Sequence, residues 1–133
     1  MVEARIRVIY GDTDQMGVVY HANYFRYFEV ARGEFFRARG GSYRNLEGEG
    51  LMLPVVEATA AYKSPARYDD VLLVRARVGG LKRVSLTFHY ELWREGAPEA
   101  LLCTGQTVHA CVDRDGKLTR LPPALVHLLQ MAL

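Results

Sequence analysis

The sequence predicts one α+β domain in which a long helix covers one face of a five-stranded antiparallel sheet. An alternating segment, 2–10, is followed by a stretch with the apolar spacing of a helix, 23–39. After Pro54 the alternation returns and continues to about residue 113, divided by turn-forming residues into four strands. Strands joined by tight turns pair antiparallel, and a single helix can cover one face of the sheet that they form.

The first strand and the helix have distinct patterns. In 2–10 apolar residues occupy every second position from Val2 to Tyr10, and charged residues lie between them. Asn23 is the predicted N-cap of the helix, and Gly40-Gly41 is its predicted end. The apolar stripe of the helix consists of Tyr24, Phe28, Ala31, Phe35 and Ala38.

The second half of the chain supplies the other strands and a short helix. The strands are predicted at 54–64, 69–79, 82–94 and 100–113. Gly79-Gly80 and 94–98 are predicted hairpin turns. Pro122-Pro123 opens the predicted C-terminal helix. Its apolar residues are Leu125, Leu128, Leu129 and Ala132. The sheet face away from the long helix is mixed, which indicates partial burial or an oligomer interface. Its polar residues include Lys63, Arg75, His89 and Glu91.

Length and composition limit the classes of function. The 133 residues predict a single domain, 1–133, with one core. The net charge is only +2 and its cations are scattered among acids, so no nucleic-acid partner is predicted. No apolar run approaches the ~20 residues of a membrane span. The N-terminal segment lacks the basic start and apolar stretch of a signal peptide, so a cytoplasmic protein is expected.

Cysteine and metal chemistry are weakly represented. Cys103 and Cys111 lie in a predicted strand, roughly 26 Å apart along it, so reduced and buried thiols are expected. Neither follows a nucleophile motif. Asp12, Asp14 and His21 are a conceivable metal set, but no other histidine or cysteine adds a ligand-spaced pair. No metal site is therefore predicted.

The densest group of reactive side chains lies at 10–24, between the first strand and the helix. This stretch contains two carboxylates, Asp12 and Asp14, and one imidazole, His21. Loops held by rigid elements are where catalytic groups concentrate, and a helix entrance offers unpaired N–H groups to a developing oxyanion. A carboxylate beside it can attack a carbonyl or activate water. Asp-x-Asp in a polar turn is more often turn chemistry or an N-cap, and the residues alone leave both interpretations open.

Two segments resemble a known family. Residues 12–24 read Asp-Thr-Asp-Gln-Met-Gly-Val-Val-Tyr-His-Ala-Asn-Tyr, and Glu29 and Arg32 follow in the helix. This resembles the signature of the 4-hydroxybenzoyl-CoA thioesterase family, particularly its branch of short-chain acyl-CoA thioesterases linked to the Tol–Pal system. Residues 63–72 resemble the family's Pro-Ala and Asp-Asp turn. The resemblance implies a hotdog fold, in which a five-stranded antiparallel sheet wraps around one long central helix, with a short C-terminal helix.

The resemblance also implies roles for residues of the loop. Asp14 takes the place of the catalytic carboxylate, as nucleophile or general base. The backbone N–H of His21 takes the place of the oxyanion donor, and the His21 side chain is a second catalytic candidate. Asp12 is interpreted as ordering the loop. Tyr20 and Tyr24 are candidates for lining the acyl pocket, with packing as the alternative, and Met52 and Tyr62 are further candidates.

The phosphates of coenzyme A require cations near the site. Lys63 and Arg67 flank Pro65. Lys82 and Arg83 match a basic region of the family, and the resemblance therefore ranks them before the other two. A solvated surface charge is the alternative for each of these four residues.

The function implied by the resemblance is acyl-CoA thioesterase activity. The substrate would be a short-chain aliphatic or aromatic acyl-CoA, and no cofactor is expected because CoA is part of the substrate. A homodimer with a continuous sheet, or a homotetramer, is also implied. Two alternatives remain open at this point. One is an acyl-thioester hydratase or dehydratase using Glu29 or Glu34, and the other is a non-catalytic module that binds acyl-CoA.

Overall fold

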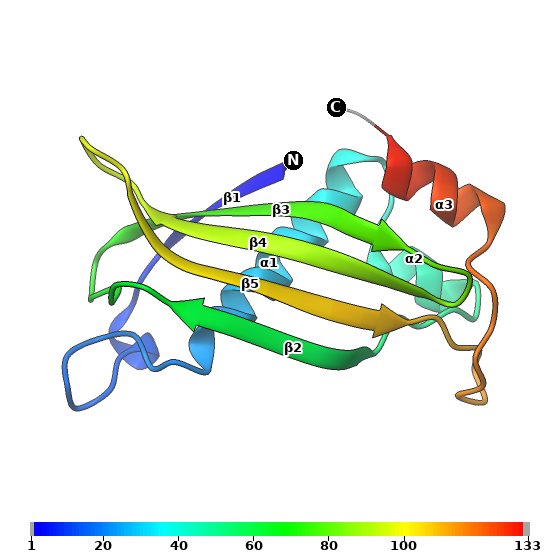
Figure 1. The fold of residues 1–133 in the computed structure, drawn as a ribbon, viewed down its shortest axis with the longest axis horizontal. Helices are drawn as coiled ribbons and strands as arrows, with labels where there is room; N and C mark the ends of the chain where they lie inside the picture. Colours follow the sequence, from blue (N-terminus) through cyan, green and yellow to red (C-terminus); the bar gives the residue numbers. More distant parts are fainter. Residues whose placement is uncertain (1, 132–133) are drawn as a thin grey trace.

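The structure, a computed structural model, describes residues 2–131 and has the predicted α+β architecture. Within these residues the five strands form one antiparallel sheet in the order β1-β3-β4-β5-β2 (Figure 1). The strands are β1 (Val2–Arg7), β2 (Val55–Tyr62), β3 (Val71–Leu81), β4 (Ser85–Arg94) and β5 (Ala100–Ala110). The helices are α1 (Asn23–Ala38), α2 (Tyr43–Gly48) and α3 (Pro123–Gln130), and a 3₁₀ turn spans Tyr10–Asp12.

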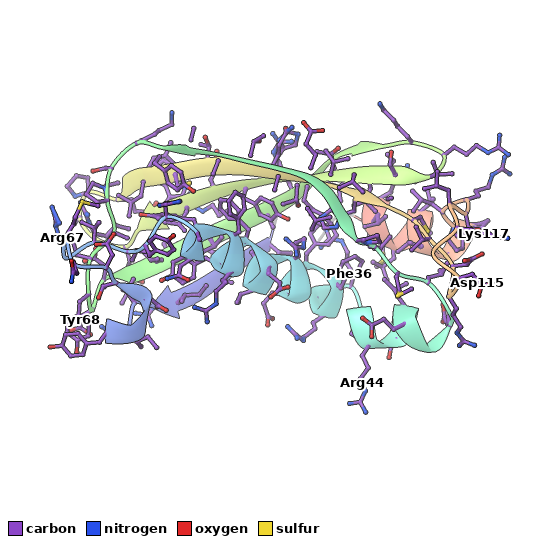
Figure 2. All side chains as sticks on the ribbon, turned by 90° about the horizontal axis from the view of Figure 1, so that it is seen from below. Phe36, Arg44, Arg67, Tyr68, Asp115 and Lys117 are labelled. Carbon is purple, nitrogen blue, oxygen red and sulfur yellow. The ribbon has the colours of Figure 1, made fainter. Side chains whose placement is uncertain are left out.

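Helix α1 lies against one face of the sheet, as Figure 2 shows from the side. The predicted apolar stripe is buried except at Ala38. The buried face of α1 also includes Tyr27, Arg32 and Phe36. The ring of Phe28 stacks on that of Tyr90 in β4, with the ring centroids 4.5 Å apart. A side-chain carbon at Gly105 in β5 would come within 2.7 Å of Phe28 Cζ, so the glycine permits this close approach.

The first strand is shorter than predicted. β1 ends at Arg7, and Tyr10 is 74% exposed rather than facing the core. The Ile9 N–H donates to the Asp12 carboxylate, and this local bond favours a 3₁₀ turn over continued pairing. Tyr10 instead stacks on Tyr68, with the ring centroids 3.9 Å apart.

The predicted turn at Gly79-Gly80 is wrong. Both glycines lie inside β3, where the register with β4 shifts between Val78 and Gly80. A side-chain carbon at Gly79 would overlap the ring of His89, so glycine serves a bulge here and not a hairpin. The chain turns at 82–84, which places Lys82 and Arg83 in the turn and not in a strand.

The helices differ from the predictions in two ways: the N-cap of α1 is another residue, and there is one additional short helix. Ala22, not Asn23, is the N-cap of α1, because the Asn23 side chain donates from Nδ2 to the Asp12 carbonyl instead (2.9 Å). The six-residue α2, which was not predicted, is too short for an apolar repeat, and Ser42 caps it by accepting the Asn45 N–H. The C-terminal helix is confirmed as α3, with Leu125 and Leu129 buried, while Ala132 lies outside the described residues.

The edge strand β2 has little cover from the rest of the chain. All of its residues are exposed except Ala60, which is half-buried. On the face away from α1, Arg75, His89 and Glu91 line a hollow of about 370 Å³, whereas Lys63 lies beyond the end of β2 and does not line it. Both cysteines are buried and unpaired, as predicted. None of the described helices is long and apolar enough to cross a bilayer.

Candidate active site

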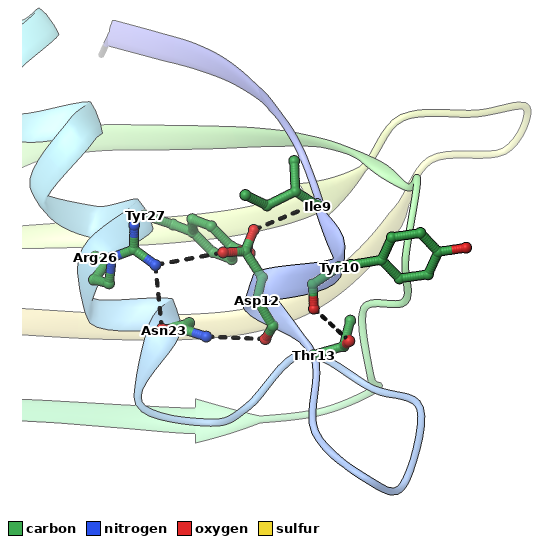
Figure 3. Close-up of polar contacts among 7 residues, drawn as sticks. All are labelled: Ile9, Tyr10, Asp12, Thr13, Asn23, Arg26 and Tyr27. Atoms are coloured by element: carbon green, nitrogen blue, oxygen red, sulfur yellow. Dashed lines mark hydrogen bonds and ion pairs between the residues drawn. The ribbon is translucent and has the colours of Figure 1, made fainter.

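Asp12 ties the loop to the first strand and to helix α1 (Figure 3). Its carboxylate is buried and accepts the Tyr27 hydroxyl at 2.9 Å and the Ile9 N–H at 3.2 Å. Arg26 forms an ion pair with the other carboxylate oxygen at 3.4 Å. The Asp12 carbonyl accepts the Tyr20 N–H, also at 2.9 Å. The interpretation of Asp12 as the residue that orders the loop is confirmed.

Asp14 is held by its own loop through one carboxylate oxygen. Oδ1 accepts the N–H of Met16 at 2.9 Å and that of Val18 at 3.4 Å. Gly17 makes this turn with a φ of +78°, a conformation that side chains disfavour. Among residues 2–131 no group forms a hydrogen bond or ion pair with Oδ2. The loop therefore orients the carboxylate and leaves one oxygen available for reaction.

The entrance of α1 offers unpaired backbone donors. In the described part of the chain, the N–H groups of His21 and Ala22 donate to no other group, while the next N–H, of Asn23, donates to the Tyr20 carbonyl. The first N–H groups of a helix lack partners within it and carry its partial positive charge. These two donors are suited to an anionic oxygen.

One cleft of about 430 Å³ joins these groups. Of the ten residues predicted from the sequence, it is lined by Asp14, His21, Tyr24, Tyr62 and Lys63. The further lining residues are Met16, Val18, Val19, Ser64 and Pro65. These five had no predicted role, although all of them lie in the two segments with the family resemblance.

Five predicted residues do not line the cleft. Met52 lines the groove between α1 and β2 instead. Tyr20 is exposed, with its ring 4.6 Å from that of His21. Arg67 is exposed at the end of the molecule where Figure 2 labels it beside Tyr68. Lys82 and Arg83 lie in the turn between β3 and β4, at the opposite end of the sheet from the loop after β1 (Figure 1). Within one chain these two cations are remote from Asp14.

The two tyrosines of the cleft use their hydroxyl groups differently. Tyr24 is buried and its oxygen accepts the Ala66 N–H at 3.2 Å, which joins α1 to the segment after β2. Tyr62, the last residue of β2, donates its hydroxyl to the His21 carbonyl at 3.0 Å. Burial raises the pKa of both hydroxyl groups, so both stay protonated at neutral pH.

Comparison with known proteins assigns the family. Residues 8–129 match the model of the thioesterase-like superfamily. The chain belongs to the thioesterase-like superfamily. A hypothetical protein from Aquifex aeolicus has a similar crystal structure, with 37% identity, a TM-score of 0.90, and coverage of 96% of this chain and 98% of that one.

Named thioesterases are among the relatives of this thioesterase-like chain. The acyl-CoA thioester hydrolase YbgC of Escherichia coli is 36% identical over 108 residues, which are 81% of this chain and 79% of that protein. The DHNA-CoA thioesterase of Staphylococcus aureus is 32% identical, with a TM-score of 0.90 and coverage of 96% and 87%. The predicted family, hotdog fold and enzyme class are confirmed, and the Tol–Pal branch stays a prediction.

Other candidate groups of the thioesterase-like chain lie outside the cleft or are chemically unsuited. Glu29 is exposed and pairs with the buried Arg32 at 3.9 Å, and Glu34 pairs with the exposed Arg37 at 2.7 Å. Neither glutamate lines the cleft. Burial raises the pKa of the Cys103 thiol to about 12, which disfavours the nucleophilic thiolate. Across residues 2–131 no three histidine, cysteine or acidic side chains are grouped as metal ligands.

Proposed function

We propose that this chain hydrolyses acyl-CoA thioesters to a free acid and CoA in the cleft that contains Asp14. The observation that carries the proposal is the meeting, in one cleft, of a carboxylate with a free oxygen and of a helix entrance with unpaired N–H groups. The activities named for the relatives from E. coli and S. aureus support the same reaction class.

The proposed mechanism assigns one task to each group. The free oxygen of Asp14 attacks the thioester carbonyl, or takes a proton from the water that attacks it. The N–H of His21 donates to the oxygen that becomes negative, and the sulfur of CoA leaves as the thiolate. Water supplies the hydroxyl of the acid product and the proton of the CoA thiol. The reaction as written requires no metal or cofactor.

The lining of the cleft supports a small acyl group. Val18, Val19, Tyr62 and Pro65 provide apolar surface, which suits a short aliphatic or an aromatic acyl chain. Lys63 has an ammonium group at the same cleft and forms no ion pair within residues 2–131, so it is the first candidate to contact an anionic part of the substrate.

A second copy of the chain completes the proposed enzyme. A long exposed edge strand with apolar side chains is normally covered by a partner, and Val55 and Val56 of β2 are 46% and 61% exposed. A groove of about 730 Å³ runs between this edge and α1, lined in part by Val30, Met52 and Val55. We propose a homodimer joined along β2, with further assembly of two dimers into a tetramer as the alternative. Sedimentation that finds a stable, active monomer would contradict this proposal.

Thioester cleavage tests the reaction directly. A panel of acyl-CoA substrates, varied in chain length and aromaticity, is incubated with the enzyme and a thiol-trapping dye. Release of free CoA by the wild type, but not by Asp14→Asn, is the expected result. Altered acyl chains without CoA release would instead indicate a hydratase, and tight binding without turnover would indicate a binding module.

The role of Lys82 and Arg83 depends on the assembly. Since they are remote from Asp14 within one chain, we propose that they contact the CoA phosphates bound at another subunit's cleft. The double variant Lys82→Glu with Arg83→Glu should then raise the KM for acyl-CoA about tenfold or more, by replacing attraction with repulsion. Lys117→Glu with Arg120→Glu, at two other exposed positions, is the matched control. An unchanged KM in the Lys82→Glu, Arg83→Glu variant would contradict the proposal that these two residues contact the CoA phosphates.

A further inference from the structure

The hydroxyl of Tyr62 contacts the residue that carries the proposed oxyanion donor. Tyr62 comes from the sheet, where its backbone pairs with Cys103 of β5, and it reaches across to the His21 carbonyl at the entrance of α1. The contact joins residues 41 positions apart in the chain. It is a link between the two layers of the fold at the point where the cleft opens.

The backbone on either side of His21 is held from two directions. Before it, the N–H of Tyr20 donates to the Asp12 carbonyl at 2.9 Å. After it, the His21 carbonyl accepts both the Tyr62 hydroxyl at 3.0 Å and, less closely, the Tyr24 N–H at 3.3 Å. With its two neighbouring peptide groups fixed, the N–H of His21 has a defined direction. An oxyanion donor is effective only when it is aimed at the place where the charge develops.

The hydroxyl also acts on the electronics of the helix entrance. The His21 carbonyl belongs to the same peptide group as the N–H of Ala22, which donates to no other group of the described chain. Hydrogen bonds in a chain polarise one another, so a donor on the carbonyl strengthens the N–H at the other side of the peptide group. Removing the hydroxyl should therefore weaken both the alignment and the polarity of the entrance.

The ring of Tyr62 is held independently of its hydroxyl. It packs edge-on against Tyr24, with centroids 5.0 Å apart, and against His21, with centroids 6.2 Å apart. A phenylalanine at this position keeps both ring contacts and loses only the hydrogen bond. The substitution Tyr62→Phe therefore isolates the effect of the hydroxyl.

We propose that Tyr62 is a positioning residue of this thioesterase site, which fixes the oxyanion donor of His21 through its hydrogen bond to the His21 carbonyl. The inference rests on the proposed function. It predicts that the hydroxyl contributes to the transition state more than to substrate binding.

The test is the steady-state kinetics of Tyr62→Phe with a well-cleaved acyl-CoA. We expect kcat to fall about three- to tenfold, which corresponds to the loss of about one hydrogen bond from the stabilisation of the transition state. KM should change less than about twofold. Tyr68→Phe is the matched control, because Tyr68 is 45% exposed against 46% for Tyr62 but does not line the cleft. Its kcat should be unchanged. An unchanged kcat for Tyr62→Phe, or an equal loss in both variants, overturns the inference.

A spectroscopic measurement separates positioning from a general loss of structure. In an Asp14→Asn background that binds but does not cleave, the infrared band of a ¹³C-labelled thioester carbonyl should shift to lower frequency on binding. The shift should be smaller when Tyr62→Phe is added, because the donor is less well aligned. An equal shift in both proteins contradicts the inference. If Asp14→Asn alone retained full turnover, the proposed mechanism would fail instead, which keeps the two failures distinct.

Discussion

Asp12 and Asp14 are two residues apart and have opposite environments. The Asp12 carboxylate is 5% exposed and accepts the Tyr27 hydroxyl and the Ile9 N–H. The Asp14 carboxylate faces a cleft and has one oxygen bound by its own loop and one free of partners in residues 2–131. Two side chains of the same chemical type therefore differ by their direction: Asp12 supports the loop, whereas Asp14 has a free oxygen at the cleft.

The largest expected effect is at Asp14, the proposed reactive acid. Asp14→Asn keeps the shape of the side chain and an oxygen for the Met16 N–H but removes the charge needed for attack or proton transfer. We expect kcat to fall about 10³-fold, with the melting temperature changed by less than about 2 °C. Thiol release and thermal unfolding measured on the same preparation check this. Turnover within tenfold of the wild type would contradict the assignment of Asp14 as the reactive acid.

The buried acid should show the opposite pattern. Asp12→Asn replaces the charged acceptor of the Tyr27 hydroxyl and the Ile9 N–H with a neutral amide at a buried position. We expect a loss of about 3 kcal/mol in the free energy of unfolding, measured by urea titration. If stability stayed within 0.5 kcal/mol of the wild type, roughly the size of ordinary surface changes, Asp12 would not be the structural support of the loop.

A buried histidine extends the comparison to pH. His109 is 1% exposed, bonded to Thr107 at 2.8 Å and to the Leu53 carbonyl at 2.9 Å, and burial lowers its pKa to about 4. Its unfolded pKa is near 6.5, so between these values the unfolded chain binds more protons. Stability is therefore full above about pH 6.5, falls as the pH falls towards 4, and levels off below it.

The expected size of this loss is about 2 kcal/mol between pH 7 and pH 5. Urea unfolding at several pH values measures it, and His109→Gln serves as the control because it removes the titrating group. The curve of the variant should be flatter by that amount over this range. Parallel curves for the two proteins would show that His109 is not the group responsible.

The smallest effect is expected at the partner of the buried acid. Tyr27→Phe removes the hydroxyl that donates to Asp12 but keeps the ring, which is 4% exposed in the core. Asp12 retains the Ile9 N–H and Arg26, so the expected loss is about 1–2 kcal/mol, with kcat near the wild-type value. A loss equal to that of Asp12→Asn would mean that the tyrosine bond alone supports the loop.

Local patterns were enough to predict the architecture and half of the residues that line the cleft. The alternation in β4 identifies the core residues Leu86, Phe88, Tyr90 and Leu92, all of them buried. Asp14, His21 and Tyr24 lie within one short segment, so a strand end and a helix entrance necessarily bring them near one cleft. The residues of the cleft could be predicted where they are neighbours in the chain.

Contacts between distant segments could not be predicted. The bond from Tyr62 to His21 depends on where β2 ends relative to α1, which no periodicity records. Gly79 has the composition of a turn, but the ring of His89 on the adjacent strand makes it a bulge. That difference also moved Lys82 and Arg83 into the turn at the far end of the sheet.

One assay of both acids tests whether the reaction depends on Asp14. The rate of CoA release per folded molecule is measured for the wild type, Asp12→Asn and Asp14→Asn, well below the melting temperature of each. We predict that Asp12→Asn retains a rate within about tenfold of the wild type, while Asp14→Asn falls about 10³-fold. The reverse order, or equal losses in the two variants, would contradict the assignment of the reaction to Asp14.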